Sequence, residues 1–282
     1  MKLSLGFSPC PNDTFIFDAL IHKKIDTEGL DFEVFFDDVE TLNQKVFKNE
    51  PDISKLSFHA FAHATENYAL LDSGSALGYG VGPLLISSSD TFTVESVRKD
   101  SRALTVGIPG KYTTANFLLS LAFPDLVNKK EMLFSEIESS LVSGSVDLGL
   151  IIHENRFTYE QKGLVKVIDL GDYWEKETGE PIPLGGIVIN RRIDPAIQAK
   201  VNRLIRKSIE FAFENPASAI GFIREHAQAM EEEVMYKHIN LYVNDFSLSL
   251  EGKGKSAVRT LFDKARALNV IPDVNVPLFF NE

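Results

Sequence analysis

A histidine directly follows a short apolar run near the middle of the chain. The run covers residues 148–152, and His153 comes next. A run of this length predicts a buried strand. Ligands of open α/β sheets bind outside the carboxyl ends of the strands, so His153 is a candidate acid–base group with an unperturbed pKa of about 6.5. The alternative is a structural histidine, satisfied in the core or holding a loop.

A second candidate segment follows the expected first strand, residues 2–7. It carries Ser8, Asn12 and Asp13, with Pro11 among them. Proline fixes its own backbone angle, and the side chain of Asn12 or Asp13 can accept hydrogen bonds from the free amides of a following turn. We therefore expect a helix to begin here, with exposed amide donors beyond the strand. Ser8 and Asn12 are candidate ligand contacts.

Two further polar segments also follow expected strands. Lys55, Leu56 and Ser57 close a short strand, and Thr113 and Thr114 precede an apolar helix. Hydroxyls and unpaired amides at a helix amino terminus can hold a carboxylate, and a lysine adds a point charge. The alternatives are an ordinary helix cap for the threonines and a surface position for the lysine.

Other suggestive features carry less chemistry. Cys10 lies between two prolines, but no histidine is adjacent in sequence, so we expect a role in packing or in the shape of the cleft. His59 and His63 have a metal-binding spacing without an apparent third ligand, so we expect no metal. The glycine-rich stretch 73–82 lacks the helix that a dinucleotide fingerprint requires, which favours a crossover between domains.

The order of expected elements indicates an α/β protein. Strands and helices alternate from residue 2 to residue 68, which is typical of a parallel sheet, and the pattern begins again near residue 104. We expect two lobes, residues 1–90 plus 190–282 and residues 91–189. Each lobe has two of the polar segments, so strand ends that face each other would bring them to one cleft.

Composition limits the possible functions. The chain has 282 residues, of which 44% are hydrophobic and 24% charged, with a formal net charge of -11. Such a charge repels polyanions, so we expect no nucleic-acid partner. No stretch reaches the roughly 20 apolar residues of a membrane span, and the amino terminus does not resemble a secretory signal. We therefore expect a cytoplasmic protein without a membrane partner; the oligomeric state stays open.

These segments together resemble the 1,4-dihydroxy-6-naphthoate synthase family of the futalosine route to menaquinone. The resemblance covers nearly the whole chain, and its first and fourth motifs are the most specific. The residues that carry it are Ser8, Pro9, Cys10, Pro11, Asn12, Asp13, Thr14 and Phe15, then Lys55, Leu56 and Ser57, then Thr113 and Thr114, then residues 149–154 and 243–248.

The resemblance implies a two-lobed, type II periplasmic-binding-protein-like fold with a ligand cleft between the lobes. It also implies a carbon–carbon lyase, without metal or organic cofactor, that converts cyclic dehypoxanthinylfutalosine into 1,4-dihydroxy-6-naphthoate. His153 matches the family's proton acceptor. The family's contacts to the small anionic substrate match Lys55, Leu56, Ser57, Thr113 and Thr114. We expect Glu154, Arg156 and Asp13 to support these groups, with Glu154 and Arg156 orienting His153 or pairing with each other.

Two other functions stay open at this stage. One is a chorismate dehydratase-like enzyme of the same pathway, and the other is a non-catalytic protein that binds small carboxylates, since one fold hosts both binding and catalysis.

Overall fold

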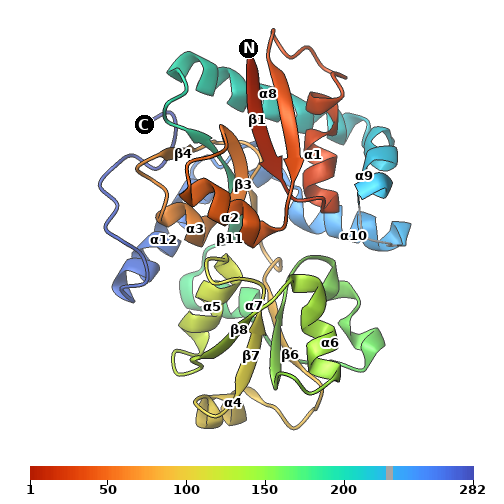
Figure 1. Cartoon of the computed structure of the whole chain (residues 1–282), viewed down its shortest axis with the longest axis vertical. Helices are drawn as coiled ribbons and strands as arrows, with labels where there is room; N and C mark the ends of the chain where they lie inside the picture. Colours follow the sequence, from red (N-terminus) through yellow and green to blue (C-terminus); the bar gives the residue numbers. More distant parts are fainter. Residues whose placement is uncertain (227–230) are drawn as a thin grey trace. The chain divides into compact units, whose positions relative to one another are not determined.

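The computed structural model describes residues 1–226 and 231–282. Residues 227–230, which belong to the expected segment 190–282, lie outside the described residues. The chain divides into two compact units, unit 1 with residues Met1–Gly78 and Pro183–Glu282, and unit 2 with residues Tyr79–Ile182. Each unit contains one sheet with helices packed on it, which makes both of them α/β (Figure 1).

Unit 1 is built on a mixed sheet with the strand order β2-β1-β3-β11-β4, and β5 also pairs with β11. Its strands are β1 (Lys2–Phe7), β2 (Asp31–Phe36), β3 (Ile53–Ser57), β4 (Tyr68–Leu70), β5 (Ala76–Gly78) and β11 (Ile182–Asn190). Its helices are α1 (Pro11–Ile21), α2 (Val39–Phe47), α3 (Phe58–Ala62), α8 (Pro195–Glu214), α9 (Ile220–His226), α10 (Glu232–Tyr242), α11 (Asp245–Leu248) and α12 (Lys253–Ala267), with the 3-10 turn η4 (Pro216–Ala219).

In unit 1 the expected parallel order holds for the first three strands only. β1 runs parallel to β2 and β3, whereas β11 returns antiparallel between β3 and β4. One face of this sheet is covered by α1, which packs against α8, α9 and α10 (Figure 1). Leu5 and Phe7 of β1 and Phe17 of α1 are fully buried in one hydrophobic cluster. The burial of this apolar surface fixes α1, and with it the segment between β1 and α1.

Unit 2 has the strand order β10-β6-β9-β7-β8. Its strands are β6 (Leu84–Ser87), β7 (Thr105–Ile108), β8 (Asn128–Glu131), β9 (Leu148–Ile151) and β10 (Val165–Asp169). Its helices are α4 (Val94–Asp100), α5 (Thr114–Ala122), α6 (Ile137–Val142) and α7 (Leu170–Thr178), with the 3-10 turns η1 (Phe134–Glu136), η2 (His153–Phe157) and η3 (Tyr159–Lys162). β7 and β9 are parallel neighbours, so their carboxyl ends lie at the same edge of the sheet.

The two sheets divide the chain at other residues than the expected lobes did. β6 pairs with β9 and β10, and so it belongs to the second sheet although it precedes residue 91. β11 pairs with β3 and β4, and so it belongs to the first sheet although it begins before residue 190. Both strands are short apolar runs, and their composition alone does not say which sheet will bury them.

Among the described residues, no helix combines the length and the hydropathy that crossing a membrane requires.

Candidate functional site

In unit 1 the structure brings together two of the predicted segments, the one after β1 and the one at the end of β3. The ammonium of Lys55 donates to Oδ1 of Asp13 at 2.9 Å and to the carbonyl of Gly74 at 3.0 Å. The other carboxylate oxygen of Asp13 accepts from the hydroxyl of Ser8 at 2.7 Å. The side chains of Lys55 and Asp13 are only 9% and 3% exposed. Lys55 is therefore a buried member of an ion pair rather than a surface lysine.

Asn12 joins the same group through its amide. Its Nδ2 donates to Oδ1 of Asp13 at 2.8 Å, and its Oδ1 lies 2.8 Å from Nε2 of His238 on α10. The prediction that Asn12 or Asp13 caps α1 is wrong, because the cap residue is Cys10 and it makes no side-chain cap bond. The amides of Asp13 and Thr14 instead donate to the carbonyl of Cys10. The side chains of Asn12 and Asp13 are held by each other and by the residues around them.

Gly74 lies in the glycine-rich stretch and has a structural role there. Its φ of 94° is unfavourable for residues with a side chain, and a Cβ at this position would meet Cδ1 of Ile187 at 2.0 Å. A glycine lets the backbone pass close to β11 and present its carbonyl to Lys55. This agrees with the interpretation of the stretch as a connection rather than a phosphate loop.

Ser57 and Leu56 lie at the end of β3, next to the loop described above. The backbone N–H of Ser57 donates to Oδ1 of Asn43 at 3.1 Å, and Nδ2 of Asn43 lies 3.4 Å from the hydroxyl of Ser57. Asn43 is fully buried on α2. Leu56 is buried too and pairs with Gly186 of β11. The position of Ser57 is thus fixed by a helix that the sequence did not connect with it.

In unit 2 the predicted threonine pair begins α5, as expected. Thr113 is the cap residue, and its hydroxyl accepts from the amide of Asn116 at 3.2 Å and donates to the carbonyl of Gly110 at 2.8 Å. Thr114 is the first residue of the helix. The hydroxyl of Thr113 caps the helix, and its backbone amide donates to the carbonyl of Gly110 at 3.4 Å, so a ligand contact from this residue would use the remaining lone pair of the hydroxyl.

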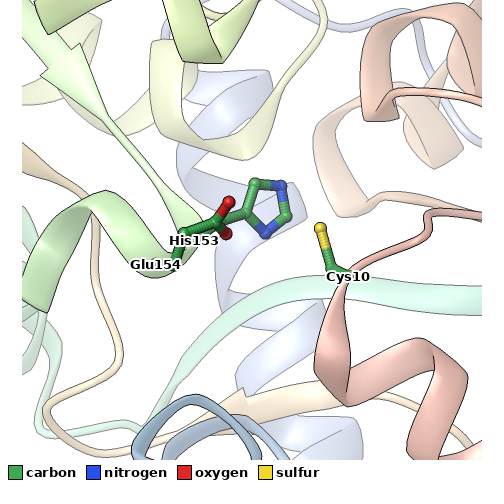
Figure 2. Close-up of side chains that lie close together, drawn as sticks. All are labelled: Cys10, His153 and Glu154. Carbon is green, nitrogen blue, oxygen red and sulfur yellow. The ribbon is translucent and has the colours of Figure 1, made fainter. Parts of the chain in front are cut away.

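His153 lies where β9 passes into η2, at the sheet edge that also carries the end of β7. Figure 2 shows it with Glu154, the next residue of η2, and also draws Cys10, which precedes α1 in unit 1. The imidazole of His153 packs edge-on against the ring of Phe134, with ring centroids 5.1 Å apart. Its φ of 57° lies in the left-handed region, which costs about 1–3 kcal/mol for a residue other than glycine. Such a conformation persists only where neighbouring contacts impose it.

Two neighbouring side chains impose the shape of η2. Arg156 donates to the carbonyl of Gly82 at 2.6 Å and to the carboxylate of Asp169 at 2.5 Å, and both members of this ion pair are largely buried. Asn155 donates to the buried Glu138 of α6 at 2.7 Å. Arg156 therefore pairs with Asp169 rather than with Glu154, and it acts on the turn that carries His153. The expectation of a Glu154–Arg156 pair is not met.

Gly82 is a second glycine of the stretch 73–82 at which the packing leaves no room for a Cβ. A Cβ on Gly82 would meet the backbone nitrogen of Gly171 at 2.1 Å, so the two segments touch through their backbones. The same Gly171 donates its amide to Asp169 at 2.8 Å, at the start of α7. One carboxylate thus caps α7 and binds Arg156.

Comparison with known proteins identifies the family. A family model described as menaquinone biosynthesis matches residues 3–267. The 1,4-dihydroxy-6-naphthoate synthase of Thermus thermophilus is 41% identical over 277 residues, which are 98% of either chain. The enzyme of the same name from Streptomyces coelicolor is 37% identical over 275 residues, 96% of this chain and 95% of the other. This chain belongs to that menaquinone biosynthesis family.

Solved structures agree on the fold of the family member. Protein AF1704 from Archaeoglobus fulgidus superimposes with a TM-score of 0.88 at 34% identity, over 96% of this chain and 98% of its own. The alkanesulfonate-binding protein SsuA from Xanthomonas axonopodis, bound to MOPS, gives a TM-score of 0.71 at 13% identity, over 96% and 94% of the two chains. The likeness to SsuA shows the periplasmic-binding-protein-like fold that the family resemblance implied.

Sequence reasoning missed several residues that position the predicted ones in this family member. Asn43, Glu138 and Asp169 lie 14, 17 and 13 positions along the chain from the groups they contact, and His238 lies 226 positions from Asn12. His238 carried a usable signal, because it stands with Met235, Ile239 and Tyr242 on the buried face of α10, where a polar residue needs a partner.

Proposed function

We propose that this member of the menaquinone biosynthesis family is a 1,4-dihydroxy-6-naphthoate synthase. It acts in the cytoplasm as a carbon–carbon lyase on cyclic dehypoxanthinylfutalosine, with no metal or organic cofactor. The names of two relatives, similar over almost their whole length, support the activity. The observation that carries the chemical assignment is His153 at the carboxyl end of β9, in a left-handed conformation imposed by its surroundings.

His153 would act as the proton acceptor. Its neutral imidazole takes the proton of a substrate hydroxyl, and the O–H electron pair forms a carbonyl while the adjacent carbon–carbon bond breaks. The electron pair of the broken bond passes into the ring fragment, which becomes aromatic, and the imidazolium of His153 returns its proton to that fragment. Atoms and charge balance without an oxidant, and the aromatic product favours the forward direction. A general base with a pKa near the working pH suits this step.

The anionic end of the substrate would be bound by hydrogen-bond donors rather than by a net positive charge. The positive charge of Lys55 is balanced by Asp13, at 2.9 Å. Among the predicted contacts, the hydroxyl of Ser57 and the backbone amides at the start of α5 are further donors, whereas the hydroxyl of Ser8 already donates to Asp13. Hydrogen bonds to uncharged donors give orientation and specificity at a concave binding surface.

The decisive experiment for the activity is product identification. The purified protein is incubated with cyclic dehypoxanthinylfutalosine, and the reaction is followed by mass spectrometry for 1,4-dihydroxy-6-naphthoate. We expect one naphthoate for each molecule of cyclic dehypoxanthinylfutalosine consumed. When chorismate is supplied instead, we expect it to stay unconverted. Turnover of chorismate would show the dehydratase, and binding of the futalosine derivative without product would show a carboxylate-binding protein.

A further inference from the structure

His238 is a fully buried histidine that the proposed reaction does not use. It comes from α10, 226 positions along the chain from Asn12, and its Nε2 lies 2.8 Å from Oδ1 of that asparagine. The ring also lies against Tyr242 on the same helix, with centroids 4.7 Å apart. Burial of a polar group costs folding free energy unless the group is hydrogen-bonded, so the contact of His238 with Asn12 stabilises the folded state.

The contacts of Asn12 decide which nitrogen of His238 carries a proton. The carboxylate of Asp13 only accepts, so the atom of Asn12 that faces it at 2.8 Å must be the amide nitrogen. The carbonyl oxygen of Asn12 therefore faces His238, and an oxygen there can only accept. His238 must donate from Nε2.

The hydrogen bonds from His238 and from Lys55 meet at Asp13. His238 donates to Asn12, Asn12 donates to Asp13, and the same oxygen Oδ1 of Asp13 accepts from the ammonium of Lys55 at 2.9 Å. α10, α1 and β3 are thereby connected through side chains that are each less than a tenth exposed. Without the donor on α10, the carbonyl of Asn12 would be buried with no partner from His238, and a rotated Asn12 would turn its oxygen toward the carboxylate of Asp13.

We propose that His238 is a positioning residue that holds Asn12, Asp13 and Lys55 in the arrangement the substrate meets. This rests on the proposed function, because Lys55 and Asn12 are proposed substrate contacts. His238 acts through Asn12 and takes no part in proton transfer. Its effect belongs to substrate affinity rather than to the chemical step.

The test compares the variants His238→Phe, His238→Gln and Met235→Ala in steady-state kinetics. His238→Phe keeps a ring and removes the donor, and we expect KM to rise about tenfold with kcat changed less than about threefold, the size of one hydrogen bond. His238→Gln keeps a donor and should recover part of the loss. Met235→Ala removes buried volume from the same face of α10 and leaves the donor of His238 in place, so its KM should stay that of the wild type.

The outcomes separate the two proposals. If the wild type makes no naphthoate, the proposed function fails whatever the variants do. If the wild type turns over and His238→Phe keeps its KM, or Met235→Ala raises KM equally, the positioning role is overturned. Nitrogen-15 NMR of the wild-type histidine rings gives a test that needs neither activity nor a folded variant: we expect the Nε2-protonated form at His238, and a ring protonated on Nδ1 alone contradicts the proposal.

Discussion

Lys55 and Asp13 form an ion pair inside unit 1, with the two atoms 2.9 Å apart. The carboxylate also accepts from Ser8 and Asn12, so three donors converge on it. Removal of one partner from a buried pair leaves the other charge without compensation, whereas removal of both avoids this cost. At the residue scale, therefore, this pair matters first for stability.

Lys55→Met should destabilise the protein by about 3–5 kcal/mol, because Asp13 then stays buried and charged. The double variant Asp13→Asn/Lys55→Met should lose less than the sum of the two single changes. Urea unfolding of the four proteins, with fitted free energies of unfolding, measures the coupling between the two residues. Additive losses would mean that the pair contributes no interaction energy of its own.

The sequence predicted the chemistry of single residues better than their partners. Thr113 caps α5 as expected, because a cap is a hydrogen bond between a side chain and a backbone amide a few residues away. Lys55 was expected to add a point charge to the substrate site or to lie at the surface, and its burial beside Asp13 depends on how β3 and α1 pack. The residues near Lys55 in sequence also do not indicate that its ammonium donates to the carbonyl of Gly74.

At the scale of elements, η2 is the short turn that carries His153, and the side chains of two adjacent residues within it hold it. Arg156 connects it to Asp169 at the start of α7 and to Gly82, while Asn155 connects it to Glu138 of α6. A short 3-10 turn has little stability of its own. Its geometry comes from these contacts.

Arg156→Met should therefore slow the reaction, because it removes the contacts that hold η2 rather than a contact with the substrate. We expect kcat to fall about 10- to 100-fold, since a displaced reacting group costs rate steeply, while circular dichroism stays that of the wild type. Lys166→Met removes an exposed cation from β10 of the same unit and serves as the control for charge. Equal rates for the two variants would show that the Arg156 contacts do not position His153.

The elements that sequence reasoning missed lack the patterns on which it depends. β8 reads Asn128, Lys129, Lys130 and Glu131, without any alternation of apolar and polar residues, and it forms by pairing with β7. β4 has three residues, too few for a periodic signal. The side chain of Asp169 caps the start of α7 by accepting from two backbone amides. The glycine in the first turn, at position 171, made this helix hard to predict from sequence. Tertiary pairing overrides weak local preference in each case.

On the scale of the whole molecule, the order of strands predicted an α/β protein with two sheets, and the described units confirm two sheets. The apolar run over residues 184–190 predicts a return strand, but the sheet in which β11 pairs and the antiparallel position of β6 do not follow from composition. Long-range connections within unit 1 also tie the amino-terminal segment to the carboxyl-terminal helices. Glu28, for example, bonds to Arg203 and Lys207 on α8.

These bonds lower the pKa of Glu28 to about 2, from an ordinary value of 4.5. A depressed carboxyl pKa stabilises the folded state fully above pH 4.5, and the stabilisation is lost as the pH falls through about 2. Wild type should therefore be more stable than Glu28→Gln at pH 7, and the difference should shrink in that acid window.

Urea unfolding at several pH values measures the difference, with Glu214→Gln at the exposed end of α8 as the control. A gap between wild type and Glu28→Gln that stays constant down to pH 2 would contradict the role assigned to the two cations.

The proton-accepting role of His153 is tested most directly by single-turnover kinetics of His153→Ala with cyclic dehypoxanthinylfutalosine in excess of its dissociation constant. The exposed His63→Ala serves as the matched control. We predict that His153→Ala loses about 10²- to 10⁴-fold in the rate of naphthoate formation and still binds the substrate within a few-fold of wild type, while His63→Ala keeps the full rate. A His153→Ala protein that forms naphthoate at the wild-type rate would assign the proton to another group.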